Sequence, residues 1–254
     1  LPREVPFLTG VTDLVLTSNE ITELPMEIGN LTRLTKLNVS KNELRAIPHT
    51  LADCVHLEDL IIGDNQLSDL PDDFAEMTSL TSLSMGNNLM VTLAPEVEFM
   101  TNLTKLSIRG NGMEKLPPWI GTLTKLSHLN IIDNPFNMLP PELGQLRNLS
   151  LLEFSDSIQY PKKEVTSKGT AFIMEYLRKI LDGKKTGVVN LMEIGLLSFP
   201  VEPISVGGLQ ELDISHNSIE EVPEIIGQMS ALTALRMQHN KIADFPESIR
   251  FLTA

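Results

Sequence analysis

The sequence lacks the features that mark membrane-spanning and secreted chains. It contains one cysteine, Cys54, so no disulfide can form within the chain, and a reducing, intracellular location such as the cytoplasm is favoured. It contains no apolar run of about eighteen residues, so insertion into a membrane is not expected. The first residues show neither a basic segment nor an apolar stretch, so no signal peptide is predicted.

Positive charge is also scarce. The 254 residues carry 20 Lys and Arg against 33 Asp and Glu, a formal net charge of −13. A protein that neutralises phosphates needs the opposite sign, so nucleic acid is not an expected partner. Hydrophobic residues make up 42% of the chain, which is enough for a continuous core.

What the chain has in place of these features is a repeat. Its frame reads L-x-x-L-x-L-x-x-N-x-L-x-x-L-P, followed by x-x-[IL]-G-x-L. A fixed period of this kind indicates stacked units that share one core. The asparagine of the frame recurs every 23 residues, at Asn19, Asn42, Asn65, Asn88, Asn111 and Asn134, and again at Asn217 and Asn240.

Each position of the frame has a structural role. The alternation in Leu37-Asn38-Val39 predicts a short strand with one buried face. A buried Asn amide in the turn that follows can bond backbone groups of neighbouring turns, which would otherwise be costly to bury. The Leu-Pro pair ends the turn, and the segment after it predicts a short, partly helical return path.

These motifs resemble the intracellular leucine-rich repeat family of the Ras-group kind, whose repeats read L-P-x-x-[IL]-G-x-L. The resemblance covers nearly the whole chain. It implies an α/β leucine-rich repeat solenoid, a curved horseshoe with a parallel concave sheet and short helices or 3-10 turns on the convex side. It leaves the function open, because such repeats serve many partners.

The predicted organisation has three parts. Residues 1–157 form repeats whose first unit is truncated, and residues 186–254 form repeats whose last unit is truncated. Both ends therefore fall inside a repeat, as expected for part of a longer polypeptide. Residues 158–185, here called the island, lengthen the seventh return path by 14 residues.

The island is predicted to hold an amphipathic helix. Thr166, Ser167 or Thr170 can cap its start, and Gly183 fits just past its end. The apolar stripe consists of Phe172, Ile173, Tyr176, Leu177, Ile180 and Leu181.

The island also indicates which leucine-rich repeat proteins the chain resembles. Its phrase PKKEVTSKGTAFIMEYLR is similar to an element that closes a repeat block in leucine-rich repeat-containing protein 40. A similar element precedes the GTPase domain of Roco proteins. No G-x-x-x-x-G-K-[ST] motif follows it here, and the repeats resume, so the first relative is favoured.

The sequence permits two arrangements of the strands on either side of the island. The preserved frame at Val189 and Leu191 favours one continuous sheet. Thr186, where the frame has Leu, and Ile194, where it has Asn, favour a joint between two blocks. Because each solenoid turn needs a neighbour to bury its face, we expect continuity.

Strand side chains that point away from the core predict a concave surface for a protein partner. Four residues, Ile61, Ile132, Leu151 and Met192, are apolar at positions expected to be exposed. Together with Arg109 and His128 they can anchor a peptide or a helix. The candidate residues are Lys36, Asn38, Ile61, Lys105, Arg109, His128, Asn130, Ile132, Glu153, Met192, Asp213 and Arg236.

The island is a second candidate surface, because it carries a net charge of +4 in an acidic chain. It either docks an acidic partner or exposes an ordinary solvated face. The candidate residues here are Lys162, Lys163, Lys184 and Lys185.

No constellation of residues points to catalysis, to a cofactor or to a metal. His128, His216 and His239 occur one per turn, without the spacing of a metal-binding pair. Cys54 fits a small core residue, and no Gly-rich phosphate loop is present. We therefore expect an intracellular protein-interaction scaffold that is not an enzyme, of open oligomeric state. A regulatory arm of a larger signalling enzyme (GTPase, kinase, phosphatase or cyclase) and an extracellular receptor or adhesin are the alternatives.

Overall fold

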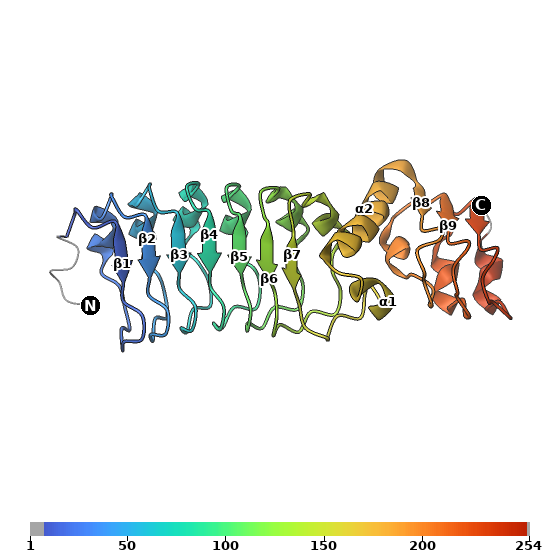
Figure 1. Ribbon diagram of the computed structural model, residues 1–254, viewed down its shortest axis with the longest axis horizontal. Coiled ribbons are helices and arrows are strands. Elements are labelled where there is room, and N and C mark those ends of the chain that lie inside the picture. The colour runs from blue at the N-terminus through green and yellow to red at the C-terminus, as the bar shows by residue number, and fades with distance from the viewer. Residues whose placement is uncertain (1–7, 253–254) are drawn as a thin grey trace. The chain divides into compact units, whose positions relative to one another are not determined.

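The computed structural model describes residues 8–252, so the start of the truncated first unit lies outside the described residues. Short parallel strands alternate with short 3-10 turns along the chain (Figure 1). The strands are β1 (Asp13–Val15), β2 (Lys36–Asn38), β3 (Asp59–Ile61), β4 (Ser82–Ser84), β5 (Lys105–Ser107), β6 (His128–Asn130), β7 (Leu151–Glu153), β8 (Val188–Asn190), β9 (Glu211–Asp213) and β10 (Ala234–Arg236).

Each return path carries one 3-10 turn, except that after β7. These turns are η2 (Met26–Asn30), η3 (His49–Asp53), η4 (Asp72–Glu76), η5 (Pro95–Phe99), η6 (Pro118–Thr122), η7 (Pro141–Gln145), η8 (Glu202–Ser205), η9 (Glu224–Gln228) and η10 (Glu247–Phe251). The path after β7 holds two α-helices instead, α1 (Lys163–Thr166) and α2 (Thr170–Thr186). The helical insertion predicted from the sequence is therefore present.

The described chain divides into two compact units. The first comprises the residues up to Phe136 together with Asn148–Ser157. The second comprises Asn137–Arg147 together with the chain from Ile158 onward. The island thus shares a unit with η7, which precedes it, and with the repeats that follow it.

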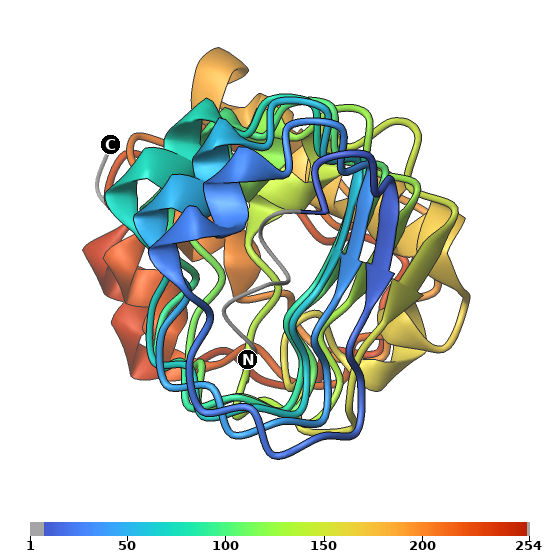
Figure 2. The ribbon, with the colours of Figure 1, turned by 90° about the vertical axis from the view of Figure 1, so that its left-hand side faces the viewer.

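In the first unit, strands β1 to β7 pair in chain order in one parallel sheet. Each strand residue pairs with the residue 23 positions later, as Leu37 does with Leu60. The central leucines of β2 to β7 are buried, and the residues beside them face outward. Figure 2 looks along this row and shows the strands on one side of each coil and the 3-10 turns on another.

The repeated asparagines form a ladder of buried amides. The side-chain oxygen of Asn65 accepts a bond from the Leu44 amide at 3.0 Å. Its nitrogen donates to the carbonyl oxygens of Val39, Ile62 and Gly63, each at 3.1 Å. Asn42, Asn88, Asn111 and Asn134 bond in the same pattern. The structural role predicted for this position is confirmed.

The residue before each repeated asparagine has a left-handed backbone, which turns the chain out of the strand. This group, here called the left-handed column, includes Ser18, Lys41, Asp64, Asn87, Gly110, Asp133, His216 and His239, with φ between 53° and 62°. Only Gly110 is a residue that adopts such angles without strain.

In the second unit, β8, β9 and β10 form a separate parallel sheet, so the expectation of one continuous sheet is wrong. The cause is local. In the regular strand β7, the amide of Leu151 donates to the carbonyl oxygen of Ser127 in the preceding repeat. In β8, the amide of Val188 donates at 3.2 Å to the hydroxyl of Thr186, the residue that stands where the frame has Leu. The joint that Thr186 suggested is therefore the arrangement observed.

Helix α2 buries the predicted apolar stripe, with Phe172 only partly covered. The predicted caps are not observed, because Gly169 occupies the first capping position and left-handed Gly187 the last. Gly183 lies inside the helix instead of ending it. A Cβ at Gly183 would lie 2.3 Å from Cγ2 of Val189, so the glycine permits close contact between α2 and β8.

Helix α2 also packs closely on η7. A Cβ added to Gly144 would lie 2.5 Å from the backbone nitrogen of Arg178. The Arg178 side chain donates through Nε to the Gly144 carbonyl oxygen at 3.0 Å. Lys184 Nζ pairs with Glu142 Oε1 at 2.7 Å. These contacts hold the island to the turn one repeat before it.

Candidate functional site

Strands β5, β6 and β7 bring most of the predicted partner-binding residues of the first unit together. The register places Lys105 beside His128 and His128 beside Leu151. It also places Asn130 beside Glu153, and the Asn130 Nδ2 donates to Glu153 Oε2 at 3.0 Å. We call this surface the β5–β7 face, and it consists of Lys105, Arg109, His128, Asn130, Ile132, Leu151 and Glu153.

The side chains of the β5–β7 face differ in exposure. Lys105, Arg109 and His128 are exposed, and Leu151 leaves 42% of its area in solvent. Ile132 is half-buried. Arg109 extends toward Asp133 of the next repeat, with Nη2 3.3 Å from Oδ2. An exposed pair of this kind is weak, so Arg109 can exchange Asp133 for a partner group at small cost.

The other candidates of the first unit lie on β2 and β3. Lys36 pairs with Asp59 across these strands at 3.2 Å. Asn38 accepts bonds from the amide and hydroxyl of Ser40. Ile61 is half-buried between small neighbours. Lys36 and Asn38 thus each have one partner within the protein, Asp59 and Ser40.

Three candidates belong to the second unit. Met192 is 41% exposed. Asp213 accepts bonds from the amide and hydroxyl of Ser215. Arg236 pairs with Glu211 at 2.9 Å. Because they lie in a different unit, they are considered separately from the β5–β7 face.

The island lysines do not converge on one point. Lys162 Nζ lies 4.5 Å from the centre of the Tyr160 ring. Lys184 is engaged with Glu142, and Lys163 and Lys185 are exposed. Two of the four predicted docking residues thus already have partners within the second unit.

The sequence analysis missed a buried polar pair beneath the island. Glu202 is only 2% exposed, and the Tyr176 hydroxyl of α2 bonds its carboxylate. Burial raises the pKa of Glu202, and its Oε1 has no hydrogen-bond partner among residues 8–252. Glu202 belongs to a return path, and Glu27, in the return path of an earlier repeat, is exposed, so the frame predicts an exposed Glu202. The place of Tyr176 in the apolar stripe of the predicted helix is the one sequence feature that points to this contact.

A second carboxylate joins the island to the next repeat. Oε1 of Glu164 accepts bonds from the amides of Leu197 and Ser198 and from the Ser198 hydroxyl, the last at 2.6 Å. Partial burial favours the neutral acid, but these hydrogen bonds outweigh it and lower the pKa of Glu164. The carboxylate therefore anchors the loop after β8 as an anion.

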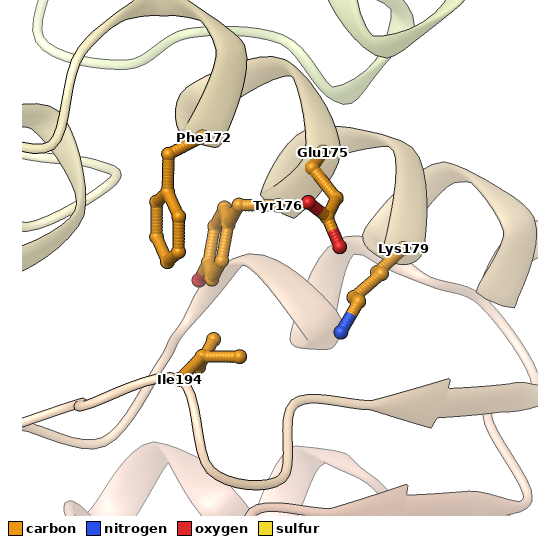
Figure 3. Close-up of a pocket in the computed structure, with 5 residues that line it drawn as sticks. All are labelled: Phe172, Glu175, Tyr176, Lys179 and Ile194. Atoms are coloured by element: carbon orange, nitrogen blue, oxygen red, sulfur yellow. The ribbon is translucent and has the colours of Figure 1, made fainter.

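Cavities near α2 are limited in size. Figure 3 shows Phe172 and Tyr176 side by side above Ile194, with Glu175 directed toward Lys179. The hollow among them has room for about 10 Å³, roughly one water molecule. It is too small for a ligand. In the part of the chain that the structure describes, no three His, Cys, Asp or Glu residues are placed to hold a metal ion.

The helices of the described chain are short or polar relative to the thickness of a bilayer. Among residues 8–252, none of them combines the length and the apolar character needed to cross a membrane.

Family comparisons find repeats in two parts of the chain. A model described as a leucine-rich repeat region matches residues 8–115, and a leucine-rich repeat model matches residues 208–229. The predicted leucine-rich repeat character is confirmed, while neither match addresses the Ras-group subfamily. Leucine-rich repeat folds are typically protein-interaction domains and not enzymes.

The curated relatives share a short segment. The mouse volume-regulated anion channel subunit LRRC8E is 38% identical over 74 residues, covering 27% of this chain and 9% of that protein. The human protein is 38% identical over 66 residues, covering 25% and 8%. The similarity therefore spans less than a tenth of the length of these relatives.

Solved structures cover more of the chain and confirm the fold class. A leucine-rich repeat protein of Leptospira interrogans is 25% identical, covers 99% of this chain and 72% of its own, and has a TM-score of 0.55. Internalin C2 of Listeria monocytogenes is 28% identical over 60% and 67%, with a TM-score of 0.54. The plant peptide hormone receptor RGFR1 in complex with RGF2 is 24% identical over 96% and 38%, with a TM-score of 0.56, and shows the fold alone.

Proposed function

We propose that this leucine-rich repeat protein is an intracellular scaffold that binds a protein partner through its β5–β7 face. The observation that supports this most is the side-by-side placement of exposed Lys105, His128 and Leu151 on three adjacent strands. Binding hot spots combine cations with apolar anchors in this way.

The scaffold beneath this face favours binding without rearrangement. The central leucines of β5, β6 and β7 are buried, and Asn111 and Asn134 fix the following turns. The outward side chains therefore start from a rigid backbone, and a partner needs to order only their rotamers.

The partner chemistry follows from the charges. Lys105 and Arg109 present cations at one side of the face, and Glu153 presents a carboxylate at the other. Ile132 follows β6, between them, and Leu151 lies on the same strand as Glu153, so both supply apolar contact beside the charged groups. A partner segment with an acidic group at one end and an apolar centre fits this order.

The test is affinity capture of partners by the tagged protein. The triple variant Lys105→Glu, Arg109→Glu, Ile132→Asp should lose the partners that the unmodified chain captures. The triple variant Arg33→Glu, Lys115→Glu, Val55→Asp makes the same chemical changes at exposed positions away from this face and should keep them. If the first variant captures the same proteins as the unmodified chain, the β5–β7 face is not the binding surface.

The intracellular setting is part of the proposal. It is supported by the composition, in which Cys54 is the single cysteine and is a buried free thiol. Fractionation of cells that express the tagged full-length protein tests it. Recovery in the secreted or surface fraction would favour the receptor or adhesin alternative, to which the likeness to internalin C2 points.

A regulatory arm of a larger signalling protein is the second candidate. The observation that favours it is that the similar segment of LRRC8E is a small part of a much longer chain. The full-length reading frame discriminates the two, because an adjoining catalytic or channel domain would make the repeats an arm of that protein.

A further inference from the structure

The second unit contains a pocket that no candidate site above explains. It opens broadly to solvent, and its volume of about 350 Å³ is within the size range of ligand pockets. Three segments line it, namely the start of the island, the loop after β8 and the loop after β9. They contribute chiefly Tyr160, Lys162, Leu197, Phe199, Glu220 and Glu221.

The walls of this pocket combine apolar side chains with polar and charged ones. Phe199 is buried, and the Tyr160 ring is half-buried. Leu197 leaves 61% of its area in solvent even though it is fixed in place by the bond from its amide to Glu164. A rigidly held, exposed leucine at the rim offers a contact surface for the aliphatic part of a ligand.

The charges of the pocket are unbalanced. Its one cation, Lys162, lies over the Tyr160 ring, and its charge also acts on the buried Glu202 carboxyl next to Val201 in the wall. Glu220 and Glu221 are exposed, and neither side chain forms an ion pair within the described residues. Lys162 likewise forms no ion pair within the described residues, so the side chains that line the pocket carry a net charge of −1 that favours a cationic ligand.

We propose that this pocket binds an arginine side chain from a peptide segment of a partner protein. The guanidinium meets Glu220 and Glu221, whose planar carboxylates match its fork of N–H donors. The aliphatic stem of the arginine packs against Leu197. The pocket shares no residue with the β5–β7 face, so this proposal and the proposed function can fail independently.

The probe for the test is the tripeptide acetyl-Leu-Arg-Leu-amide, and its control is the same peptide with citrulline, which has nearly the same shape and no charge. Each is titrated into the methyl-labelled protein to about 10 mM, since one anchoring side chain gives millimolar affinity. The arginine peptide should shift the methyl signals of Leu197 and Val201. The citrulline peptide should bind about three- to tenfold more weakly, the range expected for exposed ion pairs.

Two variants test whether the preference for the arginine peptide over the citrulline peptide arises in the pocket. The double variant Glu220→Gln, Glu221→Gln should bind both peptides with the weaker affinity. The double variant Asp182→Asn, Asp244→Asn removes the same charge from exposed positions outside the pocket and should keep the preference for arginine. Equal affinity for the two peptides, methyl shifts confined to other parts of the protein, or an unchanged preference in the first variant would each overturn the proposal.

Discussion

The side-chain nitrogen of Asn65 donates a hydrogen bond to the carbonyl oxygen of Val39, 26 residues earlier in the neighbouring repeat, at 3.1 Å. The same side chain also bonds two carbonyl groups of its own repeat and the amide of Leu44. One buried amide therefore satisfies four backbone groups and links two turns. These four hydrogen bonds therefore hold the strand and the turn that follows it in a fixed arrangement.

Replacing Asn65 by alanine should cost about 3 kcal/mol of the free energy of unfolding, because the buried amide of Leu44 loses its acceptor and the carbonyl oxygens of Val39, Ile62 and Gly63 each lose one of two donors. Urea denaturation followed by circular dichroism measures the change. Asn148→Ala is the matched control, since Asn148 is exposed and donates only to the Thr124 carbonyl oxygen, and it should cost less than about 1 kcal/mol. An equal loss of unfolding free energy in the two variants would contradict the stabilising role assigned to burial of the Asn65 amide.

A methyl group at Gly144 should disturb the contact between η7 and α2. Gly144→Ala places Cβ against the backbone of Arg178, where no rotamer change can relieve the clash, so we expect a loss of about 2 kcal/mol or more in thermal unfolding. Gly112→Ala is the control, because its nearest contact would be 3.5 Å from the Met90 oxygen. That variant should be neutral or slightly stabilising.

Glu202 should make stability depend on pH. Its pKa in the folded chain is raised by burial above the ordinary value of 4.5, so the unfolded chain releases this proton first as pH rises. The contribution of Glu202 to stability is therefore greatest below about pH 4.5, falls as pH rises toward the folded pKa, and is level above it.

Glu202→Gln removes this titration while leaving an oxygen to accept the Tyr176 hydroxyl. The difference in free energy of unfolding between the variant and the unmodified chain should move in favour of the variant as pH rises above about 4.5. Chemical denaturation at several pH values measures it. Glu175→Gln, at an exposed position of α2, should show no comparable trend, and a flat difference for Glu202→Gln would contradict the prediction.

Cys54 should resist alkylation in the folded protein. Burial, and then the charge of Asp53, raise the pKa of its thiol to about 11. At pH 8 about one thiol in a thousand is ionised, and the thiolate is the reactive form. Iodoacetamide labelling followed by mass spectrometry should be slow in buffer and fast in urea. Native labelling at the rate of a free cysteine peptide would show that the thiol is accessible.

The repeat frame predicted those parts of the fold that depend on local pattern. Leu37 and its equivalents are buried because alternation sets one strand face inward, and Asn65 is bonded because its position in the turn recurs. The side-by-side placement of residues in the β5–β7 face was also predicted from the 23-residue repeat, because paired residues of adjacent strands lie one repeat apart in the sequence.

The remaining features depend on contacts that the frame does not contain. The sheet is interrupted between β7 and β8, where α1 and α2 replace the 3-10 turn of the return path and the hydroxyl of Thr186 accepts a bond from the amide of Val188. Glu202 is buried because α2 brings Tyr176 against its return path, and Gly183 lies within α2 because Val189 approaches it closely. The pocket beside Tyr160 arises where three non-regular segments meet, so no periodic pattern indicates it.

The left-handed column has an evolutionary consequence. Its backbone angle costs a residue other than glycine roughly 1 kcal/mol, yet the column includes Lys41, Asp64 and His216. Successive members can touch, as the rings of His216 and His239 do at 4.3 Å. Because these side chains lie outside the core, a change of charge at one of them need not alter the register of the repeat. Each change also acts on the next member, as where Asn87 donates to Asp64 at 2.7 Å, so the column lets surface charge vary in coupled neighbours while the fold stays constant.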